Sequence, residues 1–401
     1  MKIPITKPYL GEEERKAILE PFESGWIVQG PKVAEFEQIF SEFTGGKYAI
    51  ATTSCTTALH LSLVALGVGP GDEVILPSFT FVATANAVEY TGATPVFCDI
   101  DIQTFNINVT EIEKKITKRT KAIIPVHLFG LSADMNPIMK MAHRHGLRII
   151  EDAACGLGSY YKGKHVGNFG NVGCFSFHPR KAITTGEGGM IITEDETLMM
   201  TFRSLRDHGA TKADLERHVD RGGSLLPSFN RLGFNYRMTD IQGALGVAQM
   251  KSAQKIIEAR RIRAERYDQL LRGEEWLRIP ECPDGQVHSY QSYVCMIRPK
   301  DYSFGAEEYS LERVSLFHNK RDQLMETLWT KGIGIRQGTH AVHHLGYYRE
   351  KYGLKSKDYL HSLIAEQWSI TLPLYVQMTD EEQDFVVKEM KRCAESLEFL
   401  I

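Results

Sequence analysis

Between about residues 30 and 200, short apolar runs alternate with stretches of helical periodicity, and this alternation constrains the fold more than any other feature. The strand-like runs are Lys47–Thr53, Glu73–Pro77, Thr94–Cys98, Ala122–Pro125 and Arg148–Glu151, and the helix-like stretches are Thr56–Gly67, Val82–Thr91 and Met135–His145. Strand–helix alternation predicts an α/β fold, with a mostly parallel sheet covered by helices on both faces. Its ligand site is expected where strands end and helices begin.

The second half of the chain has a different pattern. Residues 240–272 contain no proline and are rich in Ala, Lys, Arg and Glu, which predicts one long helix or two joined ones. Beyond this helix we expect a strand at Ser289–Pro299, a loop at 300–313, and helices at Lys320–Lys331 and Thr379–Ser396. Before it we expect another loop, at 211–229. We therefore predict a large domain over 20–245 and a smaller α+β domain over 246–401, which also includes residues 1–19.

Composition excludes several classes of protein. A net charge of −3 over 401 residues argues against nucleic-acid binding, which usually needs a basic excess. The N-terminus has no apolar signal-peptide region, and no run of about 18 apolar residues predicts a membrane span. Seven cysteines without CxxC spacing fit a reduced, cytoplasmic protein with neither disulfides nor a zinc site.

Lys181 is the first candidate for chemistry. It lies between the apolar segment that begins at Cys174 and a glycine cluster at Gly186, Gly188 and Gly189. Most lysines are solvated surface residues. Glycines at this spacing, however, let the backbone turn tightly and approach a ligand closely. A partly desolvated amine there could attack an aldehyde.

Asp152 ends the predicted strand at Arg148–Glu151, where an acid is often only a helix cap. Its alternative is to pair with a protonated pyridine nitrogen, which keeps that ring an electron sink. Lys181 and Asp152 together fit a site for pyridoxal 5′-phosphate (PLP), with Lys181 as the Schiff-base lysine.

Five further residues, in three parts of the chain, suit the phosphate and ring of such a cofactor. Residues 52–57 carry Ser54, Cys55 and Thr56 between a strand and a helix, where hydroxyls either cap the helix or bind phosphate. Ser176 could add another hydroxyl. Phe81 is either a core aromatic or a stack for a flat ring.

The stretch 335–349 crowds three His, two Arg and two Tyr into a loop-like segment. It contains no carboxylate or Cys, so we expect no metal site there. Arg and Tyr suit phosphate and sugar hydroxyls, and we expect Arg336, His340, His344 and Tyr347 to bind substrate. A solvated surface loop is the alternative.

Taken together, these motifs resemble the DegT/DnrJ/EryC1/StrS family of PLP-dependent nucleotide-sugar aminotransferases of fold type I, and within it the perosamine-synthase-like members. The similarity runs from about Pro8 to Val247 and more loosely to the C-terminus. The matching segments, in chain order, are residues 24–37, 54–61, 77–84, 151–154, 176–189 and 233–238.

The resemblance implies roles for the matching positions. Lys181 would hold PLP covalently and Asp152 would hold its ring nitrogen, with Phe81 stacked on the ring. The phosphate would be bound by Cys55, Thr56 and Ser176, and by Asn235 of a neighbouring subunit, which implies a homodimer with shared active sites. Cys155 departs from the family, because many members carry Gln or His there, near the phenolic oxygen of the cofactor.

The implied reaction takes an amino group from L-glutamate and delivers it to a nucleotide-linked keto-deoxysugar, for glycan, O-antigen (lipopolysaccharide) or antibiotic assembly. Lys181 would be the acid–base group that carries out the 1,3-prototropic proton shift of this transfer. One alternative is a PLP-dependent sugar dehydratase on the same fold, although members of that kind carry His in place of Lys181. The other is a non-catalytic regulator, in which the complete set of cofactor residues would have no purpose.

Overall fold

The computed structural model describes residues 1–211, 228–299 and 309–397, and its centre is a seven-stranded sheet in the order β1-β10-β9-β6-β5-β2-β4. All neighbouring pairs are parallel except those of β10, which runs antiparallel to both β1 and β9. The strands are β1 (Tyr48–Thr52), β2 (Glu73–Pro77), β4 (Thr94–Cys98), β5 (Thr120–Ile123), β6 (Arg148–Asp152), β9 (Val172–Ser176) and β10 (Gly189–Thr193). The predicted α/β class with a mostly parallel sheet is confirmed.

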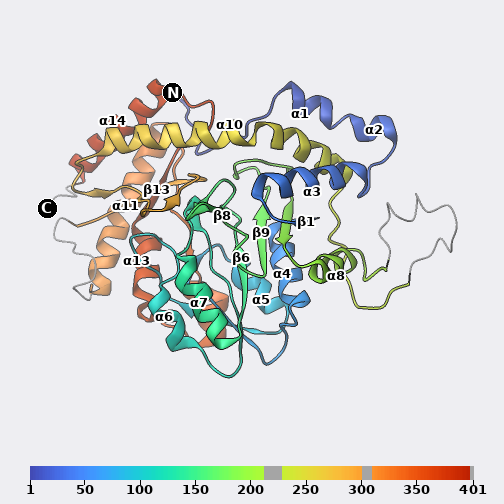
Figure 1. Ribbon diagram of the computed structural model, residues 1–401. Coiled ribbons are helices and arrows are strands. Elements are labelled where there is room, and N and C mark those ends of the chain that lie inside the picture. The colour runs from blue at the N-terminus through green and yellow to red at the C-terminus, as the bar shows by residue number, and fades with distance from the viewer. Residues whose placement is uncertain (212–227, 300–308, 398–401) are drawn as a thin grey trace.

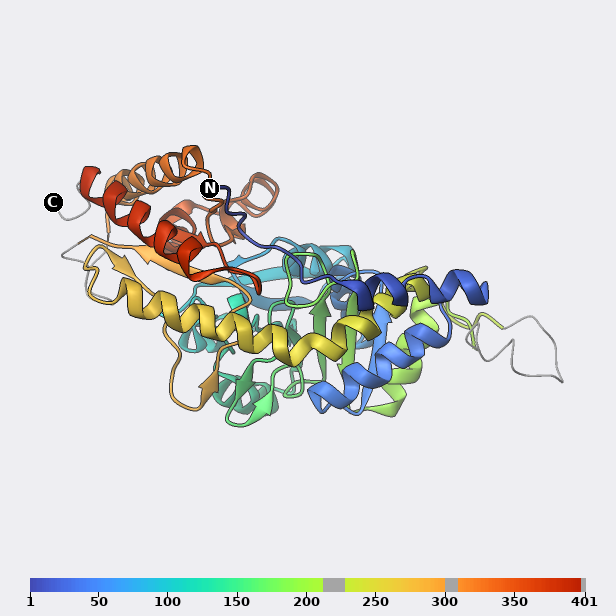
Figure 2. The ribbon, with the colours of Figure 1, turned by 90° about the horizontal axis from the view of Figure 1, so that it is seen from above.

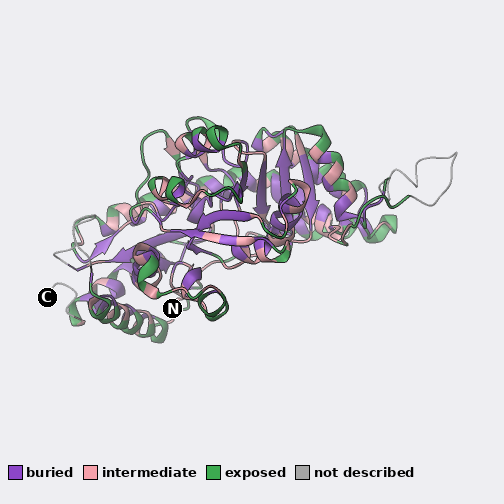
Figure 3. Cartoon of the chain, turned by 90° about the horizontal axis from the view of Figure 1, so that it is seen from below, coloured by how far each residue is buried: buried purple, intermediate pink, exposed green. Residues whose placement is uncertain are grey.

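Helices cover both faces of this sheet, which is why its strands are continuous apolar runs (Figures 1 and 3). Side chains alternate between the faces: Ile50 packs with Leu59, whereas Ala49 and Ala51 pack with Phe36. One face carries α4 (Cys55–Ala65), α5 (Ala83–Tyr90) and α8 (Glu196–Arg206). The other carries α3 (Pro31–Thr44), α6 (Val109–Lys115), α7 (Met135–His145) and the first half of α10 (Asp240–Leu271).

Helix α10 is a single long helix that runs along the molecule, as Figure 2 shows. Thr239 and Gln242 form a capping box at its start, which fixes where it begins. Gly246 lets it approach α3 closely, because an added Cβ would lie 2.7 Å from the Phe36 ring. Its last turns pack Tyr267 into a second core with Tyr293, so the two halves of the molecule share this helix.

The second core surrounds a three-stranded antiparallel sheet in the order β11-β13-β15. Its strands are β11 (Leu277–Arg278), β13 (Tyr293–Ile297) and β15 (Ser369–Leu372), and its helices are α11 (Leu311–Thr330), α13 (Leu360–Trp368) and α14 (Asp380–Ser396). The division at residues 245 and 246 stays a prediction.

Short elements complete the described chain. They are α1 (Glu12–Ala17), α2 (Glu20–Ser24), β3 (Phe79–Thr80), η1 (Leu128–Gly130), β7 (Tyr160–Tyr161), β8 (Lys164–His165), β12 (Gln286–Val287), β14 (His340–Ala341), η2 (Val342–His344), α12 (Gly346–Tyr352) and η3 (Ser356–Tyr359). In the described residues, no helix is long and apolar enough to cross a membrane.

Two expectations about loops need correction. Helix α11 begins at Leu311, inside the loop expected at 300–313, because the Ser310 hydroxyl caps it by accepting from the Arg313 amide at 3.3 Å. The buried stripe of α11 includes Arg321, and this charge hides its apolar periodicity in the sequence. Residues 300–308, and most of the loop expected at 211–229, lie outside the described residues.

The stretch 335–349 is not a solvated loop. It contains β14, η2 and the start of α12, and Val342 and Tyr348 are buried in the core of the large sheet. Strand β14 pairs with β3, so His340 lies opposite Thr80. A segment of the second half of the chain therefore packs directly beside the residue before Phe81.

Candidate active site

Lys181 lies in the loop between β9 and β10, at the carboxyl end of β9. Its Nζ donates to Cys155 Sγ at 3.2 Å, and both side chains line one cavity together with Ser176. The Lys181 amide donates to the His178 carbonyl at 2.8 Å, which closes a tight turn. The loop thus presents the amine to a cavity at the sheet edge.

Asp152 is the last residue of β6, the neighbour of β9, and only 5% of it is exposed. Its Oδ2 accepts from the Thr84 hydroxyl at 2.7 Å, and its Oδ1 accepts from the Ala154 amide at 3.1 Å. A carboxylate can accept about four hydrogen bonds, so this one keeps capacity for a further donor. Asp152 is a positioned acceptor as well as the end of a strand.

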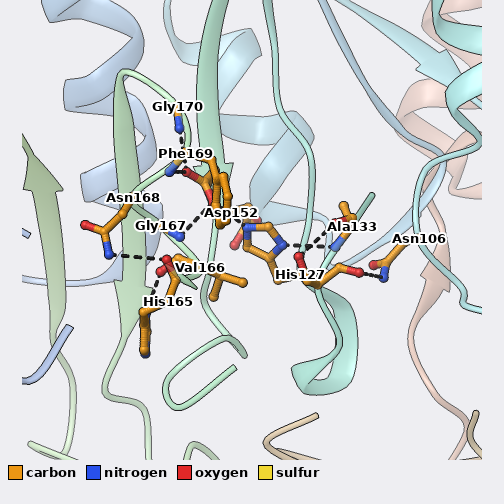
Figure 4. Close-up of polar contacts among 12 residues, drawn as sticks. Asn106, His127, Ala133, Asp152, His165, Val166, Gly167, Asn168, Phe169 and Gly170 are labelled. Atoms are coloured by element: carbon orange, nitrogen blue, oxygen red, sulfur yellow. Dashed lines mark hydrogen bonds and ion pairs between the residues drawn. The ribbon is translucent and has the colours of Figure 1, made fainter. Parts of the chain in front are cut away.

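The preceding residue, Glu151, holds this strand end in place from the other side. Its carboxylate is fully buried and accepts from the amides of Gly167, Phe169 and Gly170 at 2.6–2.7 Å. His127 Nε2 donates to it at 2.9 Å. Figure 4 shows Gly167, Phe169, Gly170 and His127 grouped around Asp152. Four donors satisfy the charge of the buried Glu151 carboxylate. Through them, Glu151 holds the loop after β8 against strand β6.

The tautomer of His127 follows from its second nitrogen. His127 Nδ1 accepts from the Ala133 amide at 3.1 Å, so the proton lies on Nε2. The His127 amide also donates to the Asp152 carbonyl at 3.0 Å. The sequence analysis did not identify Glu151, His127 or Thr84 as site residues. Glu151 alone had a visible signal, as a charged residue at the end of an apolar strand.

The start of α4 forms a cradle for an anion. Ser54 caps this helix by accepting from the Thr57 amide at 3.2 Å, so its hydroxyl has the capping role. Among the described residues, the hydroxyl of Thr56 makes no hydrogen bond, and Ser176 accepts only one weak contact, from His178 at 3.5 Å. Free amides and hydroxyls at a helix N-terminus suit a phosphate.

Gly189 explains why the cradle lies against Ser176. Gly189 is paired with Ser176 across β9 and β10. A Cβ at Gly189 would lie 2.3 Å from the Ser54 backbone, so only glycine allows this approach. The structure therefore brings together two segments that lie more than a hundred residues apart.

Cys55 lies close enough to Asp152 and Lys181 for their charges to affect it. Burial, first of all, raises the pKa of its thiol well above its ordinary value, and the Asp152 charge adds to this. The thiol is therefore neutral, and Cys55 can offer an anion its backbone amide and, more weakly, its S–H group. Phe81 is 62% exposed, which leaves its ring available for stacking.

The remaining predicted residues lie in two different places. His340 Nδ1 and His344 Nδ1 lie 3.7 and 3.2 Å from the carboxylate of Glu366, and Tyr347 is exposed near Glu89. Asn235 is exposed, and the adjacent Tyr236 carbonyl accepts from the Thr53 amide beside the cradle. In the described residues, no group of three or more His, Cys, Asp or Glu could hold a metal ion.

Arg336 is separated from these histidines. Its backbone pairs with Thr371 of the small sheet, whereas His340 pairs with Thr80. It lines a second cavity with Arg180 and Gln291.

A strand-end amine, a positioned carboxylate on the next strand, an exposed aromatic ring and an anion cradle fit the aldehyde, ring nitrogen, ring face and phosphate of PLP. The fold and this site define a PLP-dependent aminotransferase of fold type I. The chain belongs to the DegT/DnrJ/EryC1/StrS aminotransferase family, whose profile matches residues 8–391.

Three similar proteins agree with this assignment. The spore coat polysaccharide biosynthesis protein SpsC of Bacillus subtilis is 37% identical over 97% of this chain and 96% of its own length. Spr1654 of Streptococcus pneumoniae, in its PMP form, is 29% identical with a TM-score of 0.89, over 99% of this chain and 100% of that one. PseC of Helicobacter pylori, an aminotransferase involved in pseudoaminic acid biosynthesis, is 28% identical with a TM-score of 0.87 and the same coverage. The chain is a PLP-dependent sugar aminotransferase.

Proposed function

We propose that this enzyme moves an amino group from L-glutamate to the ketone of a nucleotide-linked keto-deoxysugar, for glycan, O-antigen or antibiotic sugar assembly. The observation that carries the proposal is the Lys181 amine at the edge of a cavity, one strand away from the positioned Asp152 carboxylate. The relatives support the substrate class, because SpsC is named for polysaccharide biosynthesis and PseC is an aminotransferase involved in pseudoaminic acid biosynthesis.

Each residue of the site has a definite task in such a reaction. PLP, when bound, supplies an electron sink that stabilises negative charge on the carbon that carries the amine. Asp152, held by Thr84 and Ala154, would accept from the ring nitrogen. Lys181 would act as the base that takes a proton from one carbon and returns it to another. Cys155 would orient the free Lys181 amine through their contact.

We assign the sugar nucleotide to the side of the site that contains His340, His344 and Tyr347. These three side chains come from one segment, and β14 places that segment next to β3 and Phe81. Glu366 contacts His344 Nδ1 at 3.2 Å, and Gln337 contacts His340 Nδ1 at 3.3 Å, so the outer nitrogens of both histidines can donate to or accept from sugar hydroxyls.

The test begins with Lys181. Lys181→Ala should abolish turnover with L-glutamate and every nucleotide keto-sugar, whereas Lys140→Ala, an exposed change on α7, should leave it unchanged. Borohydride reduction of the wild type, followed by peptide mass spectrometry, should find the cofactor on Lys181. The pyridoxamine form should then aminate at least one member of a panel of nucleotide keto-sugars. Attachment of the cofactor to another lysine, or no reaction with any sugar of the panel, would refute the proposal.

We also propose a homodimer in which Asn235 reaches the phosphate of the partner subunit. The segment from α2 to α3 exposes Phe22 (63%), Ile27 (49%) and Val28 (54%), and Leu232, near Asn235, is 87% exposed. Exposed apolar side chains that form a contiguous patch commonly mark interfaces. Sedimentation equilibrium should give twice the 45.3 kDa of one chain. An active monomer at micromolar concentration would contradict the shared site.

A further inference from the structure

Two buried threonines connect the Asp152 carboxylate to the turn that carries Phe81. Thr80 ends β3 and Thr84 lies in the first turn of α5, so Phe81 stands between them in the chain. The hydroxyl oxygens of Thr80 and Thr84 lie 3.0 Å apart, and the Thr84 hydroxyl lies 2.7 Å from Asp152 Oδ2. Both threonines are 1% exposed. The three groups therefore form a chain of hydrogen bonds that is shielded from solvent.

The direction of this chain follows from the number of protons. Besides Asp152 and Thr80, the Thr84 hydroxyl contacts the Phe81 carbonyl, at 3.2 Å, but it has one proton to donate. A carboxylate and a carbonyl can only accept, and the contact with the carboxylate is the shorter of the two. Thr84 therefore donates to Asp152, and its oxygen accepts from the Thr80 hydroxyl.

Thr84 is the donor that reaches Asp152 from a distant part of the chain. In the described residues, the Asp152 carboxylate accepts from two donors, the Thr84 hydroxyl at Oδ2 and the Ala154 amide at Oδ1. Because the two donors hold different oxygens and come from different segments, they fix the plane of the carboxylate. A hydroxyl that donates to a carboxylate at this distance is about twice as strong as a donor to a neutral group.

The fold keeps both threonine side chains in place. Strand β3 pairs with β14, and Thr80 lies opposite His340 in this pair. Threonine is stiff at χ1 because its Cβ is branched, and in a helix its hydroxyl can contact the carbonyl three residues earlier. Thr84 has this arrangement, since it contacts the Phe81 carbonyl. The same rotamer points its hydroxyl at Asp152, so the donor is oriented before any ligand binds.

We propose that Thr84 is a positioning residue for the cofactor, and that Thr80 acts through it. By donating to Oδ2, Thr84 holds the Asp152 carboxylate as an oriented acceptor for a protonated ring nitrogen. The two hydroxyls thereby select the protonated form of the PLP ring, which is the form that acts as an electron sink. This inference deepens the proposed function and rests on the role proposed there for Asp152, not on the identity of the sugar.

The test compares PLP with 1-deaza-PLP, which carries a C–H group in place of the ring nitrogen and keeps the aldehyde and the phosphate. The full chain is freed of cofactor, and equilibrium dialysis gives Kd for each compound. Thr84→Val keeps the shape of the side chain and removes the hydroxyl. It should raise the Kd of PLP by about tenfold and change the Kd of 1-deaza-PLP by less than about twofold, because only PLP offers an N–H group to Asp152.

Three further variants separate the hydroxyl from the fold. Thr84→Ser keeps the hydroxyl and should bind PLP within about twofold of the wild type. The matched control is Thr330→Val, which removes an exposed hydroxyl at the end of α11 and should change neither Kd. Thr80→Val should raise the Kd of PLP by about threefold. In the double variant Thr80→Val/Thr84→Val the rise should equal that of Thr84→Val alone, since Thr80 acts only through Thr84.

Equal rises in the two Kd values of Thr84→Val would overturn the inference, because Thr84 would then support only the fold of the turn. An unchanged Kd for PLP overturns it as well, and additive rises in the double variant exclude the action of Thr80 through Thr84. If the wild type binds both compounds with the same Kd, Asp152 does not hold the ring nitrogen and the inference fails with that role. If the contrasts hold but no nucleotide sugar is aminated, the proposed function fails and the positioning role stands.

Discussion

At the scale of single residues, the site depends on what surrounds each functional group. Asp152 is positioned by Thr84 and by the adjacent Glu151, whose carboxylate is satisfied by three amides and His127. Cys155 contacts the Lys181 amine, at a position where many family members carry Gln or His. These neighbours determine where the reactive groups point, because buried charges are stable only when their hydrogen bonds are complete.

Asp152→Asn should lower the rate of both half-reactions by about a hundredfold or more, since loss of a buried charge pair costs about 3–5 kcal/mol. A neutral amide can still contact the ring nitrogen but cannot hold it protonated. Stopped-flow absorbance with L-glutamate measures the first half-reaction, and cofactor retention after gel filtration separates chemistry from binding. Thr84→Ser keeps the hydroxyl and serves as the matched control. Wild-type rates in Asp152→Asn would exclude the assigned role.

At the scale of elements, helix α13 shows how tertiary contacts create a helix start. The residue at its N-cap position, Tyr359, accepts no hydrogen bond with its side chain from the first turn of the helix. Asp99, after β4, accepts instead from the amides of His361 and Ser362 at 3.0 and 2.8 Å. Because this cap lies more than 250 residues away, no local pattern announces the helix.

Asp99→Ala should lower the free energy of unfolding by about 2–3 kcal/mol, because two amides at the start of α13 lose their acceptor in a partly buried place. Urea unfolding followed by circular dichroism measures this difference. Glu350→Ala removes an exposed carboxylate of α12 and should change the same free energy by less than about 0.5 kcal/mol. Equal stability of the two variants would show that Asp99 does not hold α13.

At the scale of the whole molecule, the two halves are joined by contacts that include buried histidines. His343 Nδ1 forms a hydrogen bond of 2.6 Å with the Ser78 hydroxyl, and this bond links η2 to the segment after β2. Burial lowers the pKa of His165 and His343 to about 4 and that of His288 to about 3, against an ordinary 6.5. All three are therefore neutral in the folded protein.

The sign of the pH effect follows. Between pH 6.5 and about 4 the unfolded chain binds more protons at these histidines, so folding stability falls as pH falls. Between pH 7.5 and pH 5.5, each histidine should lower the free energy of unfolding by about 1.3 kcal/mol, and the three together by about 4 kcal/mol. Urea midpoints at pH 7.5, 6.5 and 5.5 should decrease in that order. A constant midpoint would mean that these side chains are already protonated in the folded state.

The sequence alone determined the α/β class, the strands β2 and β4, the helix α7 and the cofactor residues Lys181 and Asp152 as candidates. These features are local: apolar runs buried on both faces read as strands, and an acid or amine at a strand end is visible without knowing its neighbours. Family motifs supported the same assignments, because they lie in continuous segments.

Only the tertiary structure decided which distant groups meet. Thr84 reaches Asp152, Asp99 caps α13, and Arg336 joins Arg180 and not His340. The stretch 335–349 looked like a loop because its polar residues gave no periodicity, yet β3 supplies its strand partner. Hydrogen bonds and charges act over a few ångströms in space, and the sequence does not state which residues the fold brings within that distance.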